Sequence, residues 1–353
     1  MRVVILLYLF VLNINFCLTA LTIGSDSAVS RQALVTFPTA TANIILGGAV
    51  MENGFVFTDA LTTCSFSSFF SVLGPVNLQQ GILTLLTDLI FEDPATFTYL
   101  GNIFGNSRVL ELAPSVTYLQ MTSAVTSNVV WDNLKVILNS DIIMRNGIEF
   151  TGNCSLDGRG HVVELVDDAE LIAGTGATLK LKDVVIENVK TGKIQGLNSV
   201  STYSLQNVEF VLSDDWNFST GKLVVLDEFK ISGTNKFIYT SDQVSTISFN
   251  SSLIFDSAIT FSYNPTSNNR DLIQLLSATS LLELRGATLY STTTGLRLTK
   301  GTFRTREKSY LVAEGSVSTQ AISFGDGTVA NNVTIIPNAD LEIDGFVQYN
   351  NTA

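Results

Sequence analysis

Histidine, cysteine and proline are scarce in this chain, and so is charge. Its 353 residues include one histidine, three cysteines and six prolines, and only 15% are Asp, Glu, Lys or Arg. A single histidine excludes metal sites built from several imidazoles, and any Ser-His-Asp or Cys-His arrangement would have to use it. Because proline cannot donate a backbone hydrogen bond, its scarcity is compatible with long, uninterrupted β-ladders.

Positive charge is the scarcer of the two signs. The chain has 20 Lys and Arg against 32 Asp and Glu, which gives a net charge of −12. A nucleic-acid binder needs a basic face, so we expect no nucleic-acid partner. The acidity also disfavours docking to an anionic membrane surface. A hydrophobic content of 46% excludes a disordered chain. No pattern indicates a cofactor, and we assign none.

Only one long hydrophobic run occurs, at the amino terminus. Met1 and Arg2 precede ten apolar residues (3–12), and the chain then becomes polar and small toward Ala20. This layout is typical of a secretory signal peptide, here residues 1–20, with cleavage after Thr19 or Ala20. No later run approaches eighteen apolar residues, so we expect no transmembrane helix. The protein is therefore expected to be secreted or on the cell surface.

A short pattern recurs along the chain. It consists of a large apolar residue, any residue, a turn-forming residue, an apolar residue in most copies, any residue and a β-former. Copies begin at Leu86, Trp131, Leu156, Leu181, Leu205, Leu226, Phe255, Leu284, Leu298 and Phe324. From residue 131 onward most begin 21 to 29 residues after the previous copy, with one interval of 14. A repeat of this length indicates stacked coils.

Alternating residues around the copies predict strands. In Leu179-Lys180-Leu181 the leucines would face a core and the lysine would face solvent. An antiparallel sandwich explains strands but not this repeat, and a left-handed hexapeptide helix would keep multiples of six. We therefore expect an all-β fold, a single right-handed parallel β-helix of roughly twelve coils of about 25 residues, which forms a rod about 55–60 Å long.

The pattern also predicts the organisation of the chain. Residues 21–41 are assigned to an N-terminal cap, and residues 42–353 to the β-helix, ending in an open C-terminal coil. End-to-end association through that coil is one hypothesis, and a frayed last coil is the other. Cys64 and Cys154 would lie three or four coils apart, beyond disulfide reach, so both are expected to be buried free thiols.

Two runs carry a resemblance to a known family. Residues 154–165 (CSLDGRGHVVEL) and 179–189 (LKLKDVVIENV) resemble coils of right-handed β-helix proteins of the pectate-lyase-like superfamily. The likeness is closest to secreted adhesins, autotransporter passengers and uncharacterised exported solenoids, and it covers about residues 40–345. It implies the fold and almost nothing about activity. The arginine-rich cleavage cluster of the lyases is not evident, because Arg and Lys are scattered along the sequence.

The third position of the pattern supplies a row of polar residues. These are Asp88, Asn133, Gly158, Asp183, Asn207, Glu228, Ser257, Gly286, Lys300 and Asp326. Two of them, Asp183 and Glu228, would lie two coils apart, about 9.5 Å, which would suit an inverting glycosidase pair. Tight turns select the same residue types, so the row also fits a purely structural role.

Other candidates are weaker. His161 follows a glycine-rich turn, where a hydrogen bond to local backbone explains it better than general-base catalysis. The pairs Asp167-Asp168 and Asp214-Asp215 are interpreted as solvated loops. Tyr239 and Tyr263 would be ligand contacts if they lie in loops, or packing residues if they lie in the core.

Two functional hypotheses follow. The first is an exported, non-enzymatic β-solenoid that acts as a surface, adhesive or structural protein, with itself or a cell-surface glycan as partner. The alternative is a carbohydrate-active enzyme, a polysaccharide hydrolase or lyase, that uses Asp183 and Glu228. The sequence leans toward the first hypothesis and leaves the enzyme question open.

Overall fold

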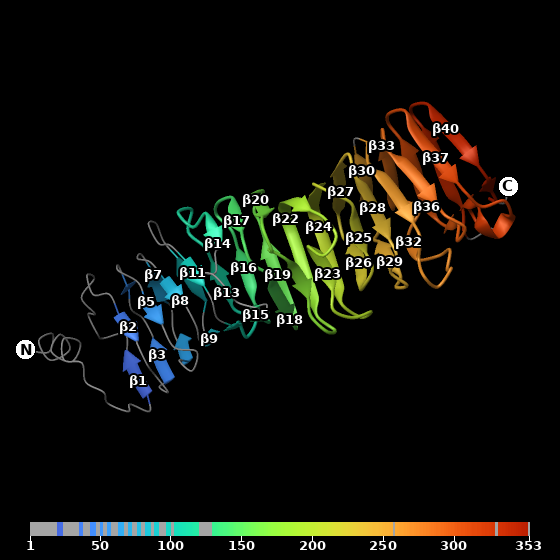
Figure 1. Cartoon of the computed structure of the whole chain (residues 1–353). Coiled ribbons are helices and arrows are strands. Elements are labelled where there is room, and N and C mark those ends of the chain that lie inside the picture. The colour runs from blue at the N-terminus through green and yellow to red at the C-terminus, as the bar shows by residue number, and fades with distance from the viewer. Residues whose placement is uncertain are drawn as a thin grey trace, which may run out of the picture.

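The chain forms an elongated stack of β-coils in the computed structural model (Figure 1). The structure describes residues 129–256, 258–328 and 331–351 throughout, and before these only shorter segments. Those segments are 20–23, 35–37, 43–46, 50–51, 55–57, 63–66, 70–72, 76–78, 82–85, 88–91, 97–99 and 102–119. Residues 1–19 of the expected export signal, 1–20, therefore lie outside the described residues, and Ala20 is the first described residue.

Between residues 43 and 337 each coil contributes one strand segment to each of three faces, and face 1 consists of two sheets in succession. The nine-stranded sheet contains β1 (Ala20–Ile23), β3 (Asn43–Leu46), β6 (Thr63–Phe66), β9 (Ile82–Leu85), β12 (Asn102–Phe104), β15 (Val129–Asp132), β18 (Ile148–Thr151), β21 (Leu171–Ala173) and β23 (Ile194–Gly196). The six-stranded sheet contains β25 (Trp216–Phe218), β28 (Lys236–Tyr239), β31 (Thr260–Tyr263), β34 (Thr288–Ser291), β37 (Ser309–Ala313) and β40 (Leu341–Gly345).

Face 2 follows face 1 along the chain from residue 43 onward. It contains β4 (Val50–Met51), β7 (Phe70–Val72), β10 (Leu89–Phe91), β13 (Val109–Glu111), β16 (Lys135–Ile137), β19 (Asn153–Asp157), the first parts of β22 (Thr178–Val189) and β24 (Thr202–Leu212), β26 (Lys222–Val225), β29 (Ser245–Ile247), β32 (Ile273–Leu275), β35 (Leu296–Leu298), β38 (Ile322–Phe324) and β41 (Val347–Tyr349). A short 3-10 turn, Ser318–Gln320, precedes β38.

Face 3 completes the coil. It contains β2 (Val35–Phe37), β5 (Phe55–Phe57), β8 (Val76–Leu78), β11 (Phe97–Tyr99), β14 (Tyr118–Leu119), β17 (Ile142–Met144), β20 (Val162–Leu165), the second parts of β22 and β24, β27 (Glu228–Gly233), β30 (Ser252–Asp256), β33 (Leu281–Arg285), β36 (Gly301–Thr305) and β39 (Val333–Pro337). The bend between faces 2 and 3 is called the 2/3 corner below.

Every described strand pairing is parallel, which confirms the expected all-β parallel solenoid. From β12 to β40 the chain makes about ten turns with a spacing of about 24 residues, and β1, β3, β6 and β9 precede β12 on face 1, so the number of coils differs from the twelve expected. Ten turns at the spacing of neighbouring strands measure roughly 48 Å. The count differs because corners range from one residue to loops such as 264–272, so residues per coil are not constant. The right-handed sense stays a prediction, supported by the handedness rule for parallel crossovers.

The first strands continue the same ladders. Within the expected cap, residues 21–41, strand β1 pairs with β3, and β2 pairs with β5. These two pairings belong to the same faces as the later coils. The remaining cap residues lie outside the part that the structure describes.

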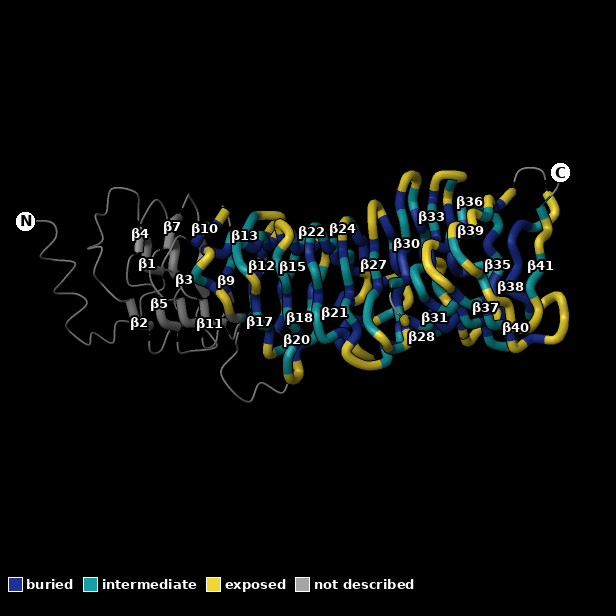
Figure 2. The backbone as a smooth tube through the Cα atoms, turned by 90° about the horizontal axis from the view of Figure 1, so that it is seen from above, coloured by how far each residue is buried: buried dark blue, intermediate teal, exposed yellow. Residues whose placement is uncertain are grey.

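Alternation along the strands fills the interior with stacked side chains. Figure 2 shows buried stretches along the strands and exposed stretches at the corners. Phe237 stacks between Trp216 at 4.6 Å and Phe261 at 5.4 Å between ring centroids. Tyr239 and Tyr263 form a second stack at 5.9 Å. These distances match the spacing of neighbouring strands, because each ring belongs to the next coil.

Tyr239 and Tyr263 are therefore core residues. Neither ring is exposed, which corrects the hypothesis that they contact a ligand. The Tyr263 hydroxyl donates to the carbonyl of Asn269 at 2.6 Å and accepts from the backbone N–H of Leu272 at 3.1 Å. Each phenol thus combines a buried ring with a polar end that holds a neighbouring loop.

Candidate functional site

The 2/3 corner is tight in two consecutive coils. Asp183 alone turns the chain within β22, and Asn207 alone turns it within β24. Both residues have left-handed backbone conformations, with φ of 47° and 52°. Asp and Asn tolerate this region better than other residues with a side chain, and this is the physical reason for their place in the pattern. The structural interpretation of the row is thereby supported at these two positions.

The neighbouring corners are wider, so the two tight corners lie at the bottom of a hollow. On one side the chain turns through residues 158–161, and on the other through 226–227 and then 248–251. The hollow has a volume of about 480 Å³. Its lining residues are Gly160, Asp183, Val184, Val185, Asn207, Val208, Glu209, Asp227, Glu228 and Lys230. The sequence-predicted pair, Asp183 and Glu228, therefore shares one hollow, with Asn207 between them.

Both carboxylate oxygens of Asp183 already have partners. The Asn207 side-chain amide donates to Oδ1 at 2.9 Å, and Lys182 Nζ lies 3.3 Å from Oδ2. Lys182 also forms an ion pair with Asp157 at 2.7 Å. The hydrogen bond to Asp157, followed by that to Asp183, raises the pKa of Lys182 above its usual value. Asp183 is thus held in place by its own coil and the next.

The other side of the hollow contains one carboxylate with two partners and two exposed carboxylates. Glu209 forms an ion pair with Lys230 at 2.8 Å and accepts a hydrogen bond from the Ser232 hydroxyl at 2.6 Å. Asp227 and Glu228 are exposed residues on the rim. The negative charge of Glu228 interacts favourably with the positive charge of Arg285. The hollow therefore presents four carboxylates, one ammonium group and one amide to solvent.

The remaining members of the polar row do not form one line. Gly158, Lys300 and Asp326 lie at the 2/3 corner like the predicted pair, whereas Asp88 and Asn133 lie between faces 1 and 2, and Gly286 between faces 3 and 1. Ser257 lies outside the described residues. The sequence pattern placed them together because every corner selects the same apolar–turn–apolar arrangement.

His161 pairs with a carboxylate and not with local backbone as expected. Its Nδ1 lies 3.2 Å from Oδ1 of Asp141, one coil earlier. The Asp141 carboxylate also accepts the backbone N–H of Val162, and this bond is the main cause that lowers the pKa of Asp141. The contact joins two corners and fits a structural role.

Cys154 is a free, buried thiol, as predicted. Burial raises the pKa of its thiol to about 11, so it is protonated at neutral pH and unsuited to nucleophilic chemistry. The side chain of Cys64 lies outside the described residues. Strand β6, which contains Cys64, belongs to face 1, and the strand of Cys154 belongs to face 2.

The two other acidic pairs have surface contacts. Asp167 forms an ion pair with Arg145 at 2.9 Å, and its side chain is 63% exposed. Asp215 accepts the backbone N–H of Lys236 at 2.8 Å. These contacts fit the interpretation of both pairs as solvated loops.

Sequence reasoning missed an arginine cluster on face 3. Glu283 is fully buried and contacts the guanidinium groups of Arg285, Arg304 and Arg306. Burial would raise the pKa of Glu283, but the hydrogen bonds from Arg285 and Arg304 outweigh it and lower the pKa. A pattern in the sequence could have revealed this cluster. Charged residues alternate with other residues in 283–285 and in 304–306, which puts Glu283 and the three arginines on the outer side of two neighbouring coils.

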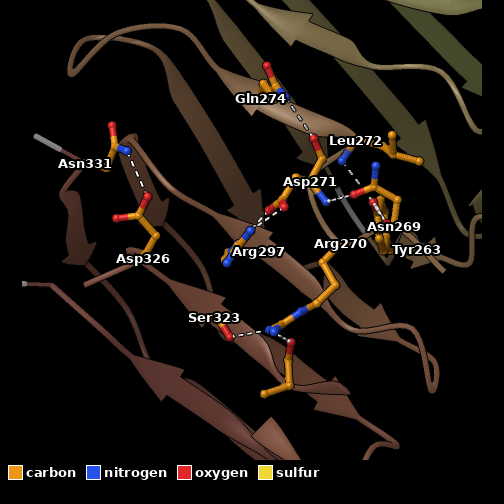
Figure 3. A network of polar contacts seen from close by, with 11 residues as sticks. Tyr263, Asn269, Arg270, Asp271, Leu272, Gln274, Arg297, Ser323, Asp326 and Asn331 are labelled. Atoms are coloured by element: carbon orange, nitrogen blue, oxygen red, sulfur yellow. Dashed lines mark hydrogen bonds and ion pairs between the residues drawn. The ribbon is translucent and has the colours of Figure 1, made fainter. Parts of the chain in front are cut away.

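Two further arginines, Arg297 of β35 and Arg270 of the loop before β32, lie at face 2 (Figure 3). Arg297 holds Asp271 with both Nε, at 2.7 Å, and Nη2, at 2.5 Å. Arg270 reaches from the loop before β32 to the Ala321 carbonyl and the Ser323 hydroxyl, at 3.0 and 2.6 Å. Arg270 thereby links the loop 264–272 to the coil of β38, two turns further along the solenoid.

Neither a metal site nor a membrane-crossing helix is found in the described residues. No group of three or more His, Cys, Asp or Glu side chains there could hold a metal ion. No helix there is long and apolar enough to cross a membrane.

Comparisons with known proteins add no assignment. No protein-family model, no curated protein and no solved structure matches this chain. The resemblance to the pectate-lyase-like superfamily thus extends only to the parallel β-solenoid itself.

Proposed function

We propose that this chain is an exported, non-enzymatic β-solenoid that acts at a cell surface as an adhesive or structural protein, and that the 2/3-corner hollow binds a glycan. One observation carries the proposal: both oxygens of Asp183 are engaged by Asn207 and Lys182. A carboxylate held in this way orients its neighbours well but is a poor proton donor or nucleophile. The stacked coils supply a rigid support for such a surface.

The chemistry of the hollow suits a hydroxyl-rich ligand. Carboxylates accept hydrogen bonds, and the Asn207 amide and Lys230 can donate them, which are the contacts that sugar hydroxyls need. Phe249 lies at the 2/3 corner one coil beyond Asp227 and is 66% exposed. An exposed aromatic ring beside polar groups offers a flat apolar surface for the other side of a sugar ring.

Glycan-array binding of the mature protein tests this proposal, with two asparagine variants. Asn207→Gly removes the amide from the hollow and keeps a residue that accepts positive φ. Asn188→Gly is the matched control, because Asn188 also has positive φ, 61°, but bonds to Glu164 outside the hollow. We expect roughly tenfold weaker binding for Asn207→Gly, the loss of one hydrogen-bonded contact, and no change for the control. Binding that is absent in the wild type, or equal in both variants, would contradict a glycan site here.

A carbohydrate-active enzyme is the second candidate, because Asp183 and Glu228 line the same hollow. Their two-coil separation, about 9.5 Å, matches the upper range for inverting glycosidases. This alternative predicts released sugar from a polysaccharide panel and a loss of activity of 10³-fold or more in Asp183→Asn and Glu228→Gln. Asp227→Asn is the matched control, since Asp227 is also on the rim. Absence of product with the wild type would exclude the enzyme for the polysaccharides tested.

A further inference from the structure

Three arginines gather around one carboxylate on the outer side of face 3. Glu283 is fully buried and accepts hydrogen bonds from Nε of Arg285 at Oε1 and from Nε of Arg304 at Oε2. Nε of Arg306 lies 3.1 Å from Oε1 of Glu283. Because Glu283 and Arg304 face each other in the ladder between β33 and β36, the cluster joins two coils.

The cluster holds more positive charge than its own carboxylate can balance. Three guanidinium charges against one carboxylate leave an excess of two positive charges, in a chain whose net charge is −12. Guanidinium groups that share one carboxylate repel each other at close range. A second anion placed against the cluster would reduce this repulsion.

Neighbouring acidic groups compensate only one side of the cluster. Asp256 lies opposite Arg285 in the ladder between β30 and β33, and the charges of Asp256 and Glu228 both interact favourably with Arg285. On the other side, Arg304 lies opposite Ile336 of β39, a strand that contains no charged residue. The excess positive charge therefore lies on the β36 side of the cluster.

The guanidinium groups can be reached from solvent. The side chain of Arg306 is 52% exposed, and those of Arg285 and Arg304 are 27% and 25% exposed. Each guanidinium has about five N–H donors, and no described residue accepts a hydrogen bond from the terminal nitrogens of Arg285 or Arg306. Glu307, the next residue, is exposed, so solvent screens its charge. Donors remain available for a ligand.

The number of arginines indicates the chemistry of that ligand. Arginine binds carboxylate and phosphate groups through pairs of N–H donors. A carboxylate has only two oxygens to share among three guanidinium groups, and Glu283 already supplies one carboxylate. A phosphate ester offers three acceptor oxygens and carries about −1.5 to −2 charges at pH 7, close to the excess of the cluster. Sulfate has the same tetrahedral shape.

We propose that Arg285, Arg304 and Arg306 bind a tetrahedral oxyanion, sulfate or phosphate, either as the free ion or as an ester group on a sugar. Glu283 is the positioning residue that holds the three guanidinium groups together. The cluster shares no lining residue with the 2/3-corner hollow. It is therefore a further binding site, and it does not rest on the function proposed for the hollow.

Calorimetric titration of the protein with sodium sulfate and with sodium phosphate, at ionic strength held constant with sodium chloride, tests this site. We expect saturable binding of at least one anion. Arg306→Gln is expected to weaken it roughly tenfold, the loss of one charge-assisted contact. Arg306→Lys keeps the charge without the planar fork and should recover only part of the affinity. No saturable binding of either anion up to about 50 mM would overturn the proposal.

Lys308→Gln is the matched control. It removes the same charge two residues beyond Arg306, where Lys308 is already paired with Glu342 at 2.6 Å, so anion binding should not change. Equal losses in Arg306→Gln and Lys308→Gln would indicate only the general field of the protein and would overturn the site. In the wild type, NMR signals of the Nε–H groups of the three cluster arginines should shift on addition of the anion. Shifts confined to other arginines, such as Arg297, would also overturn it.

A sulfated oligosaccharide and its desulfated counterpart distinguish the two sources of the oxyanion. Binding that requires the sulfate ester and is weakened by Arg306→Gln would support the site with the ester as ligand. Binding of the free ion alone, weakened by the same variant, would support the site with the ion as ligand. Sulfate-dependent binding that survives Arg306→Gln would overturn the proposal. Asn207→Gly should leave anion binding unchanged, because Asn207 lies in the hollow, so the two sites are tested separately.

Discussion

Asp183 and Asn207 each turn the chain through a corner with a single residue. At φ near 50° a β-carbon crowds the following carbonyl, and Asp and Asn offset part of this cost through local hydrogen bonds. The two residues therefore serve the fold first, and their polar ends are available to the hollow as a result. A bulky β-branched side chain would not tolerate the same backbone.

Substitutions at Asn207 test this conformational role. Asn207→Gly is expected to leave the free energy of unfolding within about 0.5 kcal/mol, because glycine accepts positive φ. Asn207→Val is expected to lower it by about 1–2 kcal/mol. Chemical denaturation measures both, and Gln206→Val, on the extended part of the same strand, is the control. Equal stability of the two Asn207 variants would show that the corner relaxes around a β-branched residue.

Glu283 is a fully buried carboxylate. Three arginines surround it, and two of them outweigh the effect of burial and hold the pKa of Glu283 below its usual value. A carboxyl group whose pKa is lower in the folded state stabilises the fold above its unfolded pKa. That stabilisation disappears as the pH falls through the folded pKa.

Glu283→Gln is expected to lower the free energy of unfolding at pH 7 by roughly 3 kcal/mol, because the arginines lose their buried partner. As the pH falls from the usual pKa of a glutamate through the lower folded pKa of Glu283, the wild type should lose stability and the difference between the two proteins should shrink. Denaturant melts at pH 7 and pH 3.5 measure this change. Glu307→Gln, on an exposed turn, is the control. A constant difference at both pH values would contradict the assigned role of Glu283.

At the scale of elements, the stacked aromatic rows connect one coil to the next. Phe237 contacts Trp216 before it and Phe261 after it, so it belongs to two interfaces between coils. In a solenoid each coil is stabilised mainly by its nearest neighbours. A cavity at Phe237 should therefore weaken the contacts of β28 on both sides.

Phe237→Ala is expected to cost about 3–5 kcal/mol, the usual range for a buried aromatic side chain. Hydrogen exchange of β25, β28 and β31 measures the local effect, which should exceed that in β15 or β40. Phe249→Ala removes the same side chain from a position that is 66% exposed, and it should change stability by less than about 0.5 kcal/mol. An effect spread evenly over all coils would indicate that the rod unfolds as one unit.

At the scale of the whole molecule, stability should vary along the rod. The coils that contain β22 and β24 have neighbours on both sides and long continuous strands, whereas β39, β40 and β41 each pair on one side only among the described strands. Local opening is easiest where the fewest contacts are lost.

Native-state hydrogen exchange of dilute protein should therefore be slowest in β22 and β24 and fastest in β39, β40 and β41. Last-coil protection equal to that of β22 in dilute monomers would contradict the open edge.

The sequence by itself determined the parallel solenoid, because alternation within strands and residues suited to corners are local properties that recur at every coil. It also placed Asp183, Asn207 and Glu228 at one corner, since consecutive coils stack them in register. It did not reveal that Asp88, Asn133 and Gly286 occupy other corners, because all three corners use the same residue pattern. Only the tertiary structure decided that Glu283 meets three arginines, that Tyr239 and Tyr263 are buried, and that a hollow forms above two tight turns. Those features depend on the number of residues in each corner, which sets the register and width of the neighbouring coils.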